Sequence, residues 1–215
     1  NRQFHPWEGG EGKVSGQYRY SLVQLAKKAI ADGSYEQAIT FLEQAQHYPV
    51  NLGEGKLFGA QENDIFYWLG CAYQGLKQTD LANNYFVKAT IGLEEPSAAM
   101  FYNDQQPDQI FYQGLAWRKL GEQGKATNIF KKLIAYGEEH GNDEVKVDYF
   151  AVSLPNLLLF EDDLSLRNKA HCYFMQGLGY VGLEKPAEAK TFLSKVLELD
   201  AEHQGAKTHL EMLVL

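Results

Sequence analysis

The chain of 215 residues is poor in several residue types: it has two cysteines, three methionines and six prolines. Two cysteines, Cys71 and Cys172, are too few for a framework of disulfide bonds, so we expect reduced thiols buried in helices. No apolar run approaches the roughly 18 residues that a membrane-spanning helix needs. These scarcities argue against a disulfide-stapled secreted domain and against a membrane span.

Basic residues are also the minority. Lysine and arginine number 20 against 28 aspartates and glutamates, which gives a formal net charge of −8. Phosphate backbones are bound through basic surfaces, so this balance argues against a nucleic-acid partner. Apolar residues make up 45 % of the chain, which is enough for a continuous core. The length fits one domain or two small ones.

Motifs that carry chemistry are scarce as well. GEGK occurs at 10–13 and 53–56, but a phosphate-binding loop would need glycine where Trp7 and Val50 stand. We therefore read both as turns. The six histidines show no paired spacing suited to a metal ion, and there is no G-x-S-x-G nucleophile motif. We predict no metal site, no cofactor and no catalytic residues in this chain.

What the chain does contain is a repeat. Residues 66–73 read FYWLGCAY and residues 110–117 read IFYQGLAW. Aligned on a small residue at position 8, the repeats start near residues 19, 63, 107 and 170. Glycine in a helix interior costs about 1 kcal/mol against alanine. Its recurrence at Gly70, Gly114 and Gly177 therefore predicts that two helices pack closely at this position.

The pattern resembles the tetratricopeptide repeat, W-x2-L-G-x2-Y followed by A-x3-F. The resemblance implies an all-α fold in which antiparallel helix pairs stack into a right-handed superhelix. We expect a single domain over residues 1–215, closed by a capping helix at 202–214 with Ala206, Leu210 and Leu213 on its apolar face. The alternative is an ordinary helical bundle whose periodicity arose by chance.

Several helix ends carry recognisable signals. Pro107 and Pro186 suit the first turns of two helices, since proline is tolerated there. The expected N-caps are Ser15, Ser34 (in a capping box with Gln37), Thr79 and either Asp162 or Asp163.

The repeat starts are unusually far apart. They are separated by 44, 44 and 63 residues, against a minimal repeat of about 34. The insertions are 50–62, 94–106 and 138–169. The first two hold Phe58, Met100, Phe101 and Tyr102, which are apolar enough that we expect the loops to fold back and pack. The third has acidic ends and an apolar middle, so it is either a packed spacer or a functional lid.

In this family one face of each first helix lines the inner groove, at positions 2, 5, 9 and 12. An aromatic row there, Tyr67, Phe111 and Phe174, could hold a peptide helix or stack on a sugar. It could equally be covered by the insertions or by another domain. The residues Val23, Lys27, Trp68, Asp108 and Tyr112 stand where chaperone-binding members carry a carboxylate clamp, so we reject a chaperone terminus. The groove candidates are Lys27, Tyr67, Cys71, Gln74, Phe111, Leu115, Arg118, Phe174 and Leu178.

A closer resemblance is carried by HYPVNLGEGKLFGAQENDIFYWLG (47–70) and MFYNDQQPDQIFYQGLAWRKLG (100–121). These segments look like the C-terminal region of large uncharacterised bacterial proteins that have an N-terminal β-sandwich similar to galactose mutarotase. The resemblance implies that the chain is the C-terminal fragment of a carbohydrate-related parent. It carries over no catalytic residue.

Two functions follow as hypotheses. The first is a non-catalytic interaction or scaffold module that binds a peptide segment, a partner domain, its parent's N-terminal domain or a second copy in a homo-oligomer. The second is an accessory domain of a carbohydrate-active enzyme. In the second case loop residues would reach a sugar, and the candidates are Trp7, Glu54, Tyr102, Asn103 and Asp104. The favoured location is the cytoplasm.

Overall fold

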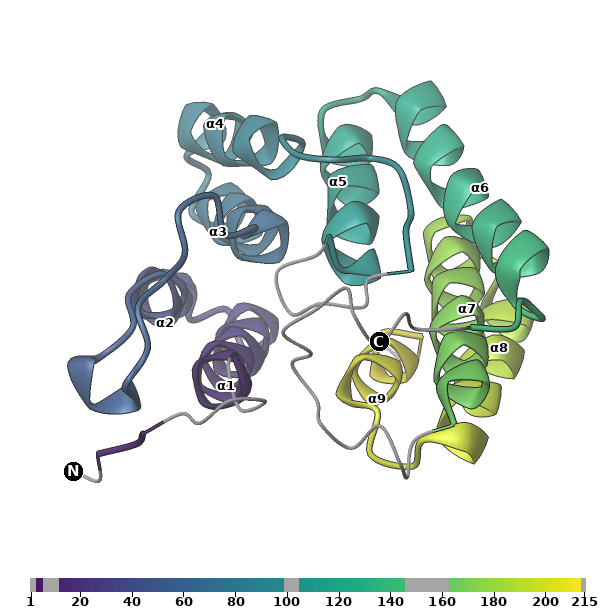
Figure 1. Cartoon of the computed structure of the whole chain (residues 1–215). Coiled ribbons are helices and arrows are strands. Elements are labelled where there is room, and N and C mark those ends of the chain that lie inside the picture. The colour runs from purple at the N-terminus through teal and green to yellow at the C-terminus, as the bar shows by residue number, and fades with distance from the viewer. Residues whose placement is uncertain (1–2, 6–11, 99–104, 146–162, 214–215) are drawn as a thin grey trace. The chain divides into compact units, whose positions relative to one another are not determined.

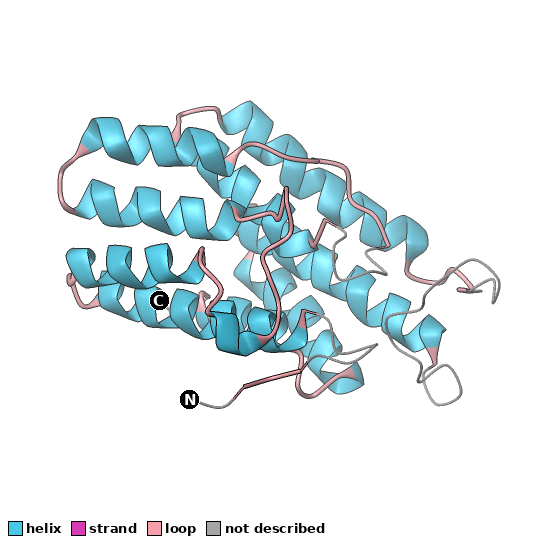
Figure 2. Cartoon of the chain, turned by 60° about the vertical axis from the view of Figure 1, so that its left-hand side comes forward, coloured by secondary structure: helices cyan, strands magenta, loops and turns pink. Residues whose placement is uncertain are grey.

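The computed structural model describes residues 3–5, 12–98, 105–145 and 163–213, and every regular element among them is helical (Figure 1). Figure 2 shows the same helices and their connecting loops coloured by type. The elements are α1 (Lys13–Ala31), α2 (Tyr35–Ala45), a 3-10 turn (Val50–Leu52), α3 (Asn63–Gly75), α4 (Thr79–Ala89), α5 (Pro107–Lys119), α6 (Gln123–His140), α7 (Leu164–Gly182), α8 (Pro186–Leu199) and α9 (Gln204–Glu211). The predicted all-α fold is confirmed.

The helices gather into two compact units. Unit 1 contains α1–α4, and unit 2 contains α5–α9. Within each unit, helices that follow one another in the chain pack together as pairs, and each pair packs on the next. The expectation that all repeats form one domain stays a prediction.

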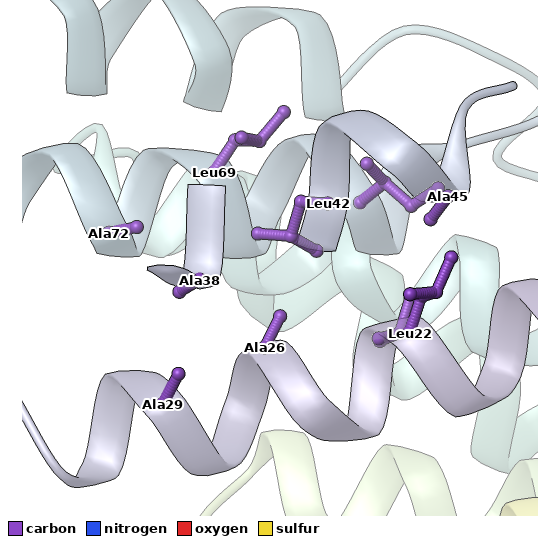
Figure 3. Close-up of a cluster of buried hydrophobic side chains, with 10 residues drawn as sticks. Leu22, Ala26, Ala29, Ala38, Leu42, Ala45, Leu69 and Ala72 are labelled. Atoms are coloured by element: carbon purple, nitrogen blue, oxygen red, sulfur yellow. The ribbon is translucent and has the colours of Figure 1, made fainter. Parts of the chain in front are cut away.

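The core of unit 1 lies where α1, α2 and α3 meet (Figure 3). Leu22, Leu42 and Leu69 fill the space between the helices, while small residues allow the backbones to approach. The small residues drawn there are Ala26, Ala29, Ala38, Ala45 and Ala72. This alternation of large and small side chains gives the close packing that protein interiors require.

The glycines at repeat position 8 have the role that the sequence predicted. A Cβ atom on Gly70 would lie 2.5 Å from the Phe86 ring, and one on Gly177 would lie 2.6 Å from Leu193. Gly114 faces Phe130 in the same way. In these three repeats the second helix thus places a large side chain directly over the glycine of the first.

A left-handed residue occurs at the same place in every repeat, in the turn between the two helices. Gly33 and Gly121 have φ angles of 75° and 84°, and Lys77 and Glu184 have 61° and 58°. In all four turns the next residue donates its backbone N–H to a carbonyl five residues earlier, as Ser34 does to Ala29. This is the hydrogen bond of a Schellman motif, which ends a helix in a defined direction.

The helix caps correct part of the sequence analysis. Asp163 caps α7 as predicted, because its carboxylate accepts from the backbone N–H groups of Ser165 and Leu166 at 2.9 and 3.1 Å. The prediction for Ser15 is wrong: α1 begins at Lys13, and the Ser15 hydroxyl donates to Glu54 instead. Ser34 stands at the predicted N-cap position of α2, but its side chain makes no cap hydrogen bond. The prediction for Thr79 is wrong, because Thr79 is the first residue of α4 rather than its cap.

We expect Asp163→Ala to lower the free energy of unfolding by about 0.5–2 kcal/mol, because two backbone donors lose their acceptor. Asp163→Asn should keep most of the stability, since its side-chain oxygen can still accept. Urea unfolding followed by circular dichroism measures both. Equal losses in the two variants would contradict a capping role.

The insertions differ from expectation where the structure describes them. Leu52 in the first insertion is buried, but Phe58 is fully exposed, so the expected packing of Phe58 is wrong. Met100, Phe101 and Tyr102 lie outside the described residues. Helix α6 extends into the third insertion as far as His140, and α7 begins inside it at Leu164. No helix in the described segments is long and apolar enough to cross a membrane.

Candidate functional site: the predicted groove residues

In unit 2 the aromatic residues predicted to line the groove are covered by α9. Phe111 is 0 % exposed and Phe174 is 6 % exposed. The His209 ring of α9 lies 5.2 Å from the Phe111 ring and 5.8 Å from the Phe174 ring, measured between centroids. The expected covers were the insertions or another domain, and the terminal helix was not among them.

The buried face of α9 is not the face that the apolar pattern predicted. Ala206 is buried, but Leu210 is half-buried, while Thr208 and His209 are buried instead. The packing of α9 therefore depends on Thr208 and His209 more than on Leu210. The Nδ1 atom of His209 lies 2.7 Å from the Gly205 carbonyl oxygen one turn earlier, so the imidazole satisfies a backbone acceptor of its own helix.

A second histidine fixes the start of α9. The Nδ1 atom of His203 accepts from the Ala206 backbone N–H at 3.1 Å, and the His203 ring lies 4.7 Å from the Phe174 ring. Burial lowers the pKa of His203, and the nearby Asp200 carboxylate opposes that shift. Burial also lowers the pKa of His171 in α7, against the opposing effect of the hydrogen bond between its Nε2 and the Ser97 carbonyl.

We expect stability to fall as the pH drops below about 6.5, the ordinary histidine value. Both folded-state pKa values lie below that of the unfolded chain, so the unfolded state binds more protons in this window. Protonation would also remove the lone pair with which His203 caps α9. His203→Asn keeps an acceptor and removes the titration, so its urea midpoint should change less between about pH 7.5 and about pH 5.5. An unchanged pH dependence in the variant would contradict this role.

The other groove candidates of unit 2 are either buried or bonded to neighbouring residues. Leu115 and Leu178 are buried. Arg118 is half-buried, donates to Glu184 Oε1 at 2.9 Å and also donates to the Gly182 carbonyl. The same guanidinium lies 5.2 Å from the centre of the Phe130 ring. Arg118 thus connects α5 to the turn between α7 and α8.

In unit 1 the predicted residues divide into buried and accessible ones. Tyr67 is buried, with its ring 5.2 Å from Trp68 and 6.0 Å from Phe86. Lys27 is half-buried with its Nζ atom 5.5 Å from the centre of the Trp68 ring. Cys71 is half-buried and Gln74 is exposed. We call Lys27, Cys71 and Gln74 the α1–α3 face.

Of the predicted loop residues, the structure describes Glu54. Its carboxylate accepts from the Gly12 backbone N–H at 2.6 Å and from the Ser15 hydroxyl at 2.5 Å. A carboxylate at the beginning of α1 also complements the positive end of the helix dipole. The other loop candidates, Trp7, Tyr102, Asn103 and Asp104, lie outside the described residues.

Neither cysteine is in a disulfide bond. Cys172 is buried as expected, and burial raises the pKa of its thiol to about 11, with a further contribution from Asp143. Cys71 is only half-buried, so the expectation of burial is wrong for that residue. Within the described ranges, no three histidine, cysteine or acidic side chains gather closely enough to hold a metal ion.

The packing of paired helices around small residues agrees with a comparison of the sequence with known families. The tetratricopeptide repeat model matches residues 64–90 and 170–203. These two stretches are tetratricopeptide repeats. The first covers α3 and α4 of unit 1, and the second covers the pair formed by α7 and α8 in unit 2.

One solved structure, described as the MamA RS-1 ArsTM double mutant, aligns with 94 % of this chain and 84 % of its own chain. The two share 16 % identity with a TM-score of 0.29. Because this likeness is weak, the assignment of tetratricopeptide repeats depends on the two stretches that match the family model.

Proposed function

We propose that this chain is a non-catalytic interaction module that binds a segment of a partner protein. The observation that supports the proposal is the presence of tetratricopeptide repeats in both units. Helical repeats of this kind stack into extended surfaces that are used for binding. The partner would be a peptide segment or a domain, including the N-terminal domain of a longer parent protein or a second copy.

Differences in burial favour the α1–α3 face of unit 1 as the binding surface. In unit 2 Leu115, which stands at the repeat position of Cys71, is buried, and a ligand could reach the Phe111 ring only after α9 moved. In unit 1 Gln74 is exposed, and Lys27 and Cys71 are half-buried. This face combines a cation, an aromatic ring beneath it and an amide, which suits a peptide with both apolar and polar side chains.

A photo-crosslinking residue at position 74 tests this proposal. Gln74 would be replaced by the crosslinker, and Asn84, which is exposed on α4, would be replaced in the matched control. We expect a protein adduct in extracts of the source cells from position 74 and not from position 84. Adducts of equal yield from both positions, or none from position 74, would overturn the α1–α3 face as the binding surface.

The alternative is an accessory role in a carbohydrate-active enzyme. It is supported by the part-buried Glu54 carboxylate, which accepts two hydrogen bonds. The charge of this carboxylate also helps to raise the pKa of Tyr48, so the two side chains are near each other. A carboxylate beside an aromatic ring suits a sugar. A thermal-shift panel of mono- and oligosaccharides tests it: stabilisation that Glu54→Gln abolishes would support the sugar site, and no stabilisation would contradict it.

A further inference from the structure

Unit 1 has a hollow of about 620 Å³. It lies beside the last two turns of α2 and the residues that follow, and it is reached by one tyrosine from α1 and one from α4. The residues on which its chemistry depends are Tyr18, Thr40, Glu43, Gln46, Tyr48 and Tyr85. Among the described residues that line it there is no lysine or arginine.

Two polar side chains of this hollow, Thr40 and Gln46, have their donor groups engaged elsewhere and keep acceptors available, and Gln44 and His47 also line it. The Thr40 hydroxyl donates to the Glu36 carbonyl at 3.1 Å, which leaves its oxygen lone pairs available. The Gln46 Nε2 group donates to Glu62 at 3.3 Å, which leaves the Gln46 Oε1 atom as an acceptor. Glu62 is itself buried and paired with Lys56 at 3.0 Å, so Gln46 is held in this orientation.

Negative charge surrounds the same hollow. Glu43 is exposed at its edge and has no ion-pair partner within the residues that the structure describes. Burial raises the pKa of Tyr85, and Tyr73 and the Glu43 carboxylate raise it further. Burial also raises the pKa of Tyr48; Arg19 opposes this shift, while the carboxylates of Glu62, Glu54 and Asp64 add to it. Of the basic neighbours, Arg19 and Lys56 are already paired with Asp64 and Glu62, while the Lys88 ammonium lies over the Tyr85 ring.

Of the three tyrosine rings that line the hollow, two are available for stacking. The Tyr85 ring already contacts Tyr73, at 5.3 Å, and the Lys88 ammonium, at 4.8 Å. Tyr18 and Tyr48 have no ring or cation partner in the part of the chain that the structure describes. Aromatic faces beside an unpaired carboxylate attract cations.

We propose that this hollow binds the guanidinium group of an arginine side chain presented by a partner protein. The proposal rests on the proposed function and names the chemistry of the partner. Guanidinium is a planar cation with five donors and no acceptor, so it matches a lining that offers acceptors and aromatic rings. A basic partner segment also complements the formal net charge of −8.

The test is a titration of the 15N-labelled chain with N-acetyl-arginine amide, followed by NMR. N-acetyl-citrulline amide is the matched probe, because it has nearly the same shape and no charge. We expect saturable shifts of the Gln46 side-chain amide and of residues 43–48 with the arginine probe. The citrulline probe should bind about tenfold more weakly, since a charge-assisted hydrogen bond is roughly twice as strong as a neutral one.

A pair of variants tests whether binding depends on the carboxylate at the edge of the hollow. Glu43→Gln should weaken binding of the arginine probe about five- to tenfold. Glu188→Gln, which removes a carboxylate from α8 in unit 2, should leave binding unchanged. The proposal is overturned if both probes bind equally, if glucose shifts these resonances and arginine does not, or if the shifts spread evenly over the acidic surface.

The outcome is separable from that of the proposed function. Failure of the arginine probe together with an adduct at position 74 would overturn the guanidinium site and leave the interaction module standing. Arginine binding without any protein adduct would overturn the claim that a partner protein supplies the guanidinium group. The hollow would then bind a small guanidinium compound.

Discussion

Phe130→Ala is expected to lower the free energy of unfolding by about 3–5 kcal/mol, the usual cost of removing a buried phenylalanine ring. Phe130 is 0 % exposed on α6 and packs against Phe111 at 5.8 Å. Its ring also occupies the space that Cβ atoms on Gly114 and Gly182 would need. Helices α5 and α7 thus both pack against α6 at this one side chain.

The loss should lie at the upper end of that range, because glycines have no side chains that could move into the cavity. Urea unfolding followed by circular dichroism measures it. Val87→Ala is the control, since Val87 is exposed on α4 and its truncation should change stability by less than about 0.5 kcal/mol. A loss below about 1 kcal/mol for Phe130→Ala would contradict the described packing.

Gly137→Ala is expected to be strongly disruptive, although it replaces only a single hydrogen by a methyl group. A Cβ atom on Gly137 would lie 2.5 Å from the Cys172 carbonyl oxygen and 2.7 Å from Gln176 Cγ. A Cβ atom on Gly179 would likewise lie 2.6 Å from the Phe130 carbonyl oxygen. Since the obstacles include backbone atoms, α6 and α7 would have to move apart, and we expect a loss of about 1–3 kcal/mol or more.

The matched control lies in the same helix. Gly124 is in the first turn of α6, and a Cβ atom there would meet nothing within 4 Å. Gly124→Ala should raise stability by about 0.4–1 kcal/mol, because alanine restricts the unfolded chain. Thermal and urea unfolding of the two variants should therefore shift in opposite directions. Stabilisation of similar size in both variants would mean that helix propensity and chain entropy, rather than the close approach of α6 and α7, decide the result.

Much of the repeat architecture could be predicted from the sequence, because its determinants are local. Gly70, Gly114 and Gly177 recur at one offset, and a close helix contact at that offset accounts for the cost of a recurring glycine. Gly137 and Gly179 make an equally close contact, but they stand outside the repeat pattern. Nothing in their sequence spacing distinguishes them from the glycines of surface helices.

The candidate site was less predictable for a related reason. Spacing by three and four residues correctly indicated that Phe111 and Leu115 share a helix face, but it cannot tell what packs on that face. The covering residue, His209, belongs to a short helix almost a hundred residues away. In the hollow of unit 1, the acceptor character of Thr40 and Gln46 depends on where their hydrogens are directed, and the sequence holds no sign of that.

The left-handed turns have a consequence for how the chain opens. A residue other than glycine in this conformation costs roughly 1–2 kcal/mol. At Glu184 the ion pair with Arg118 offsets part of that cost, whereas no salt bridge or hydrogen bond holds the Lys77 side chain within the described residues. Gly33, in the corresponding turn between α1 and α2, adopts its conformation without strain. Amide hydrogens of unit 1 should therefore exchange with solvent sooner around the turn between α3 and α4 than around Gly33.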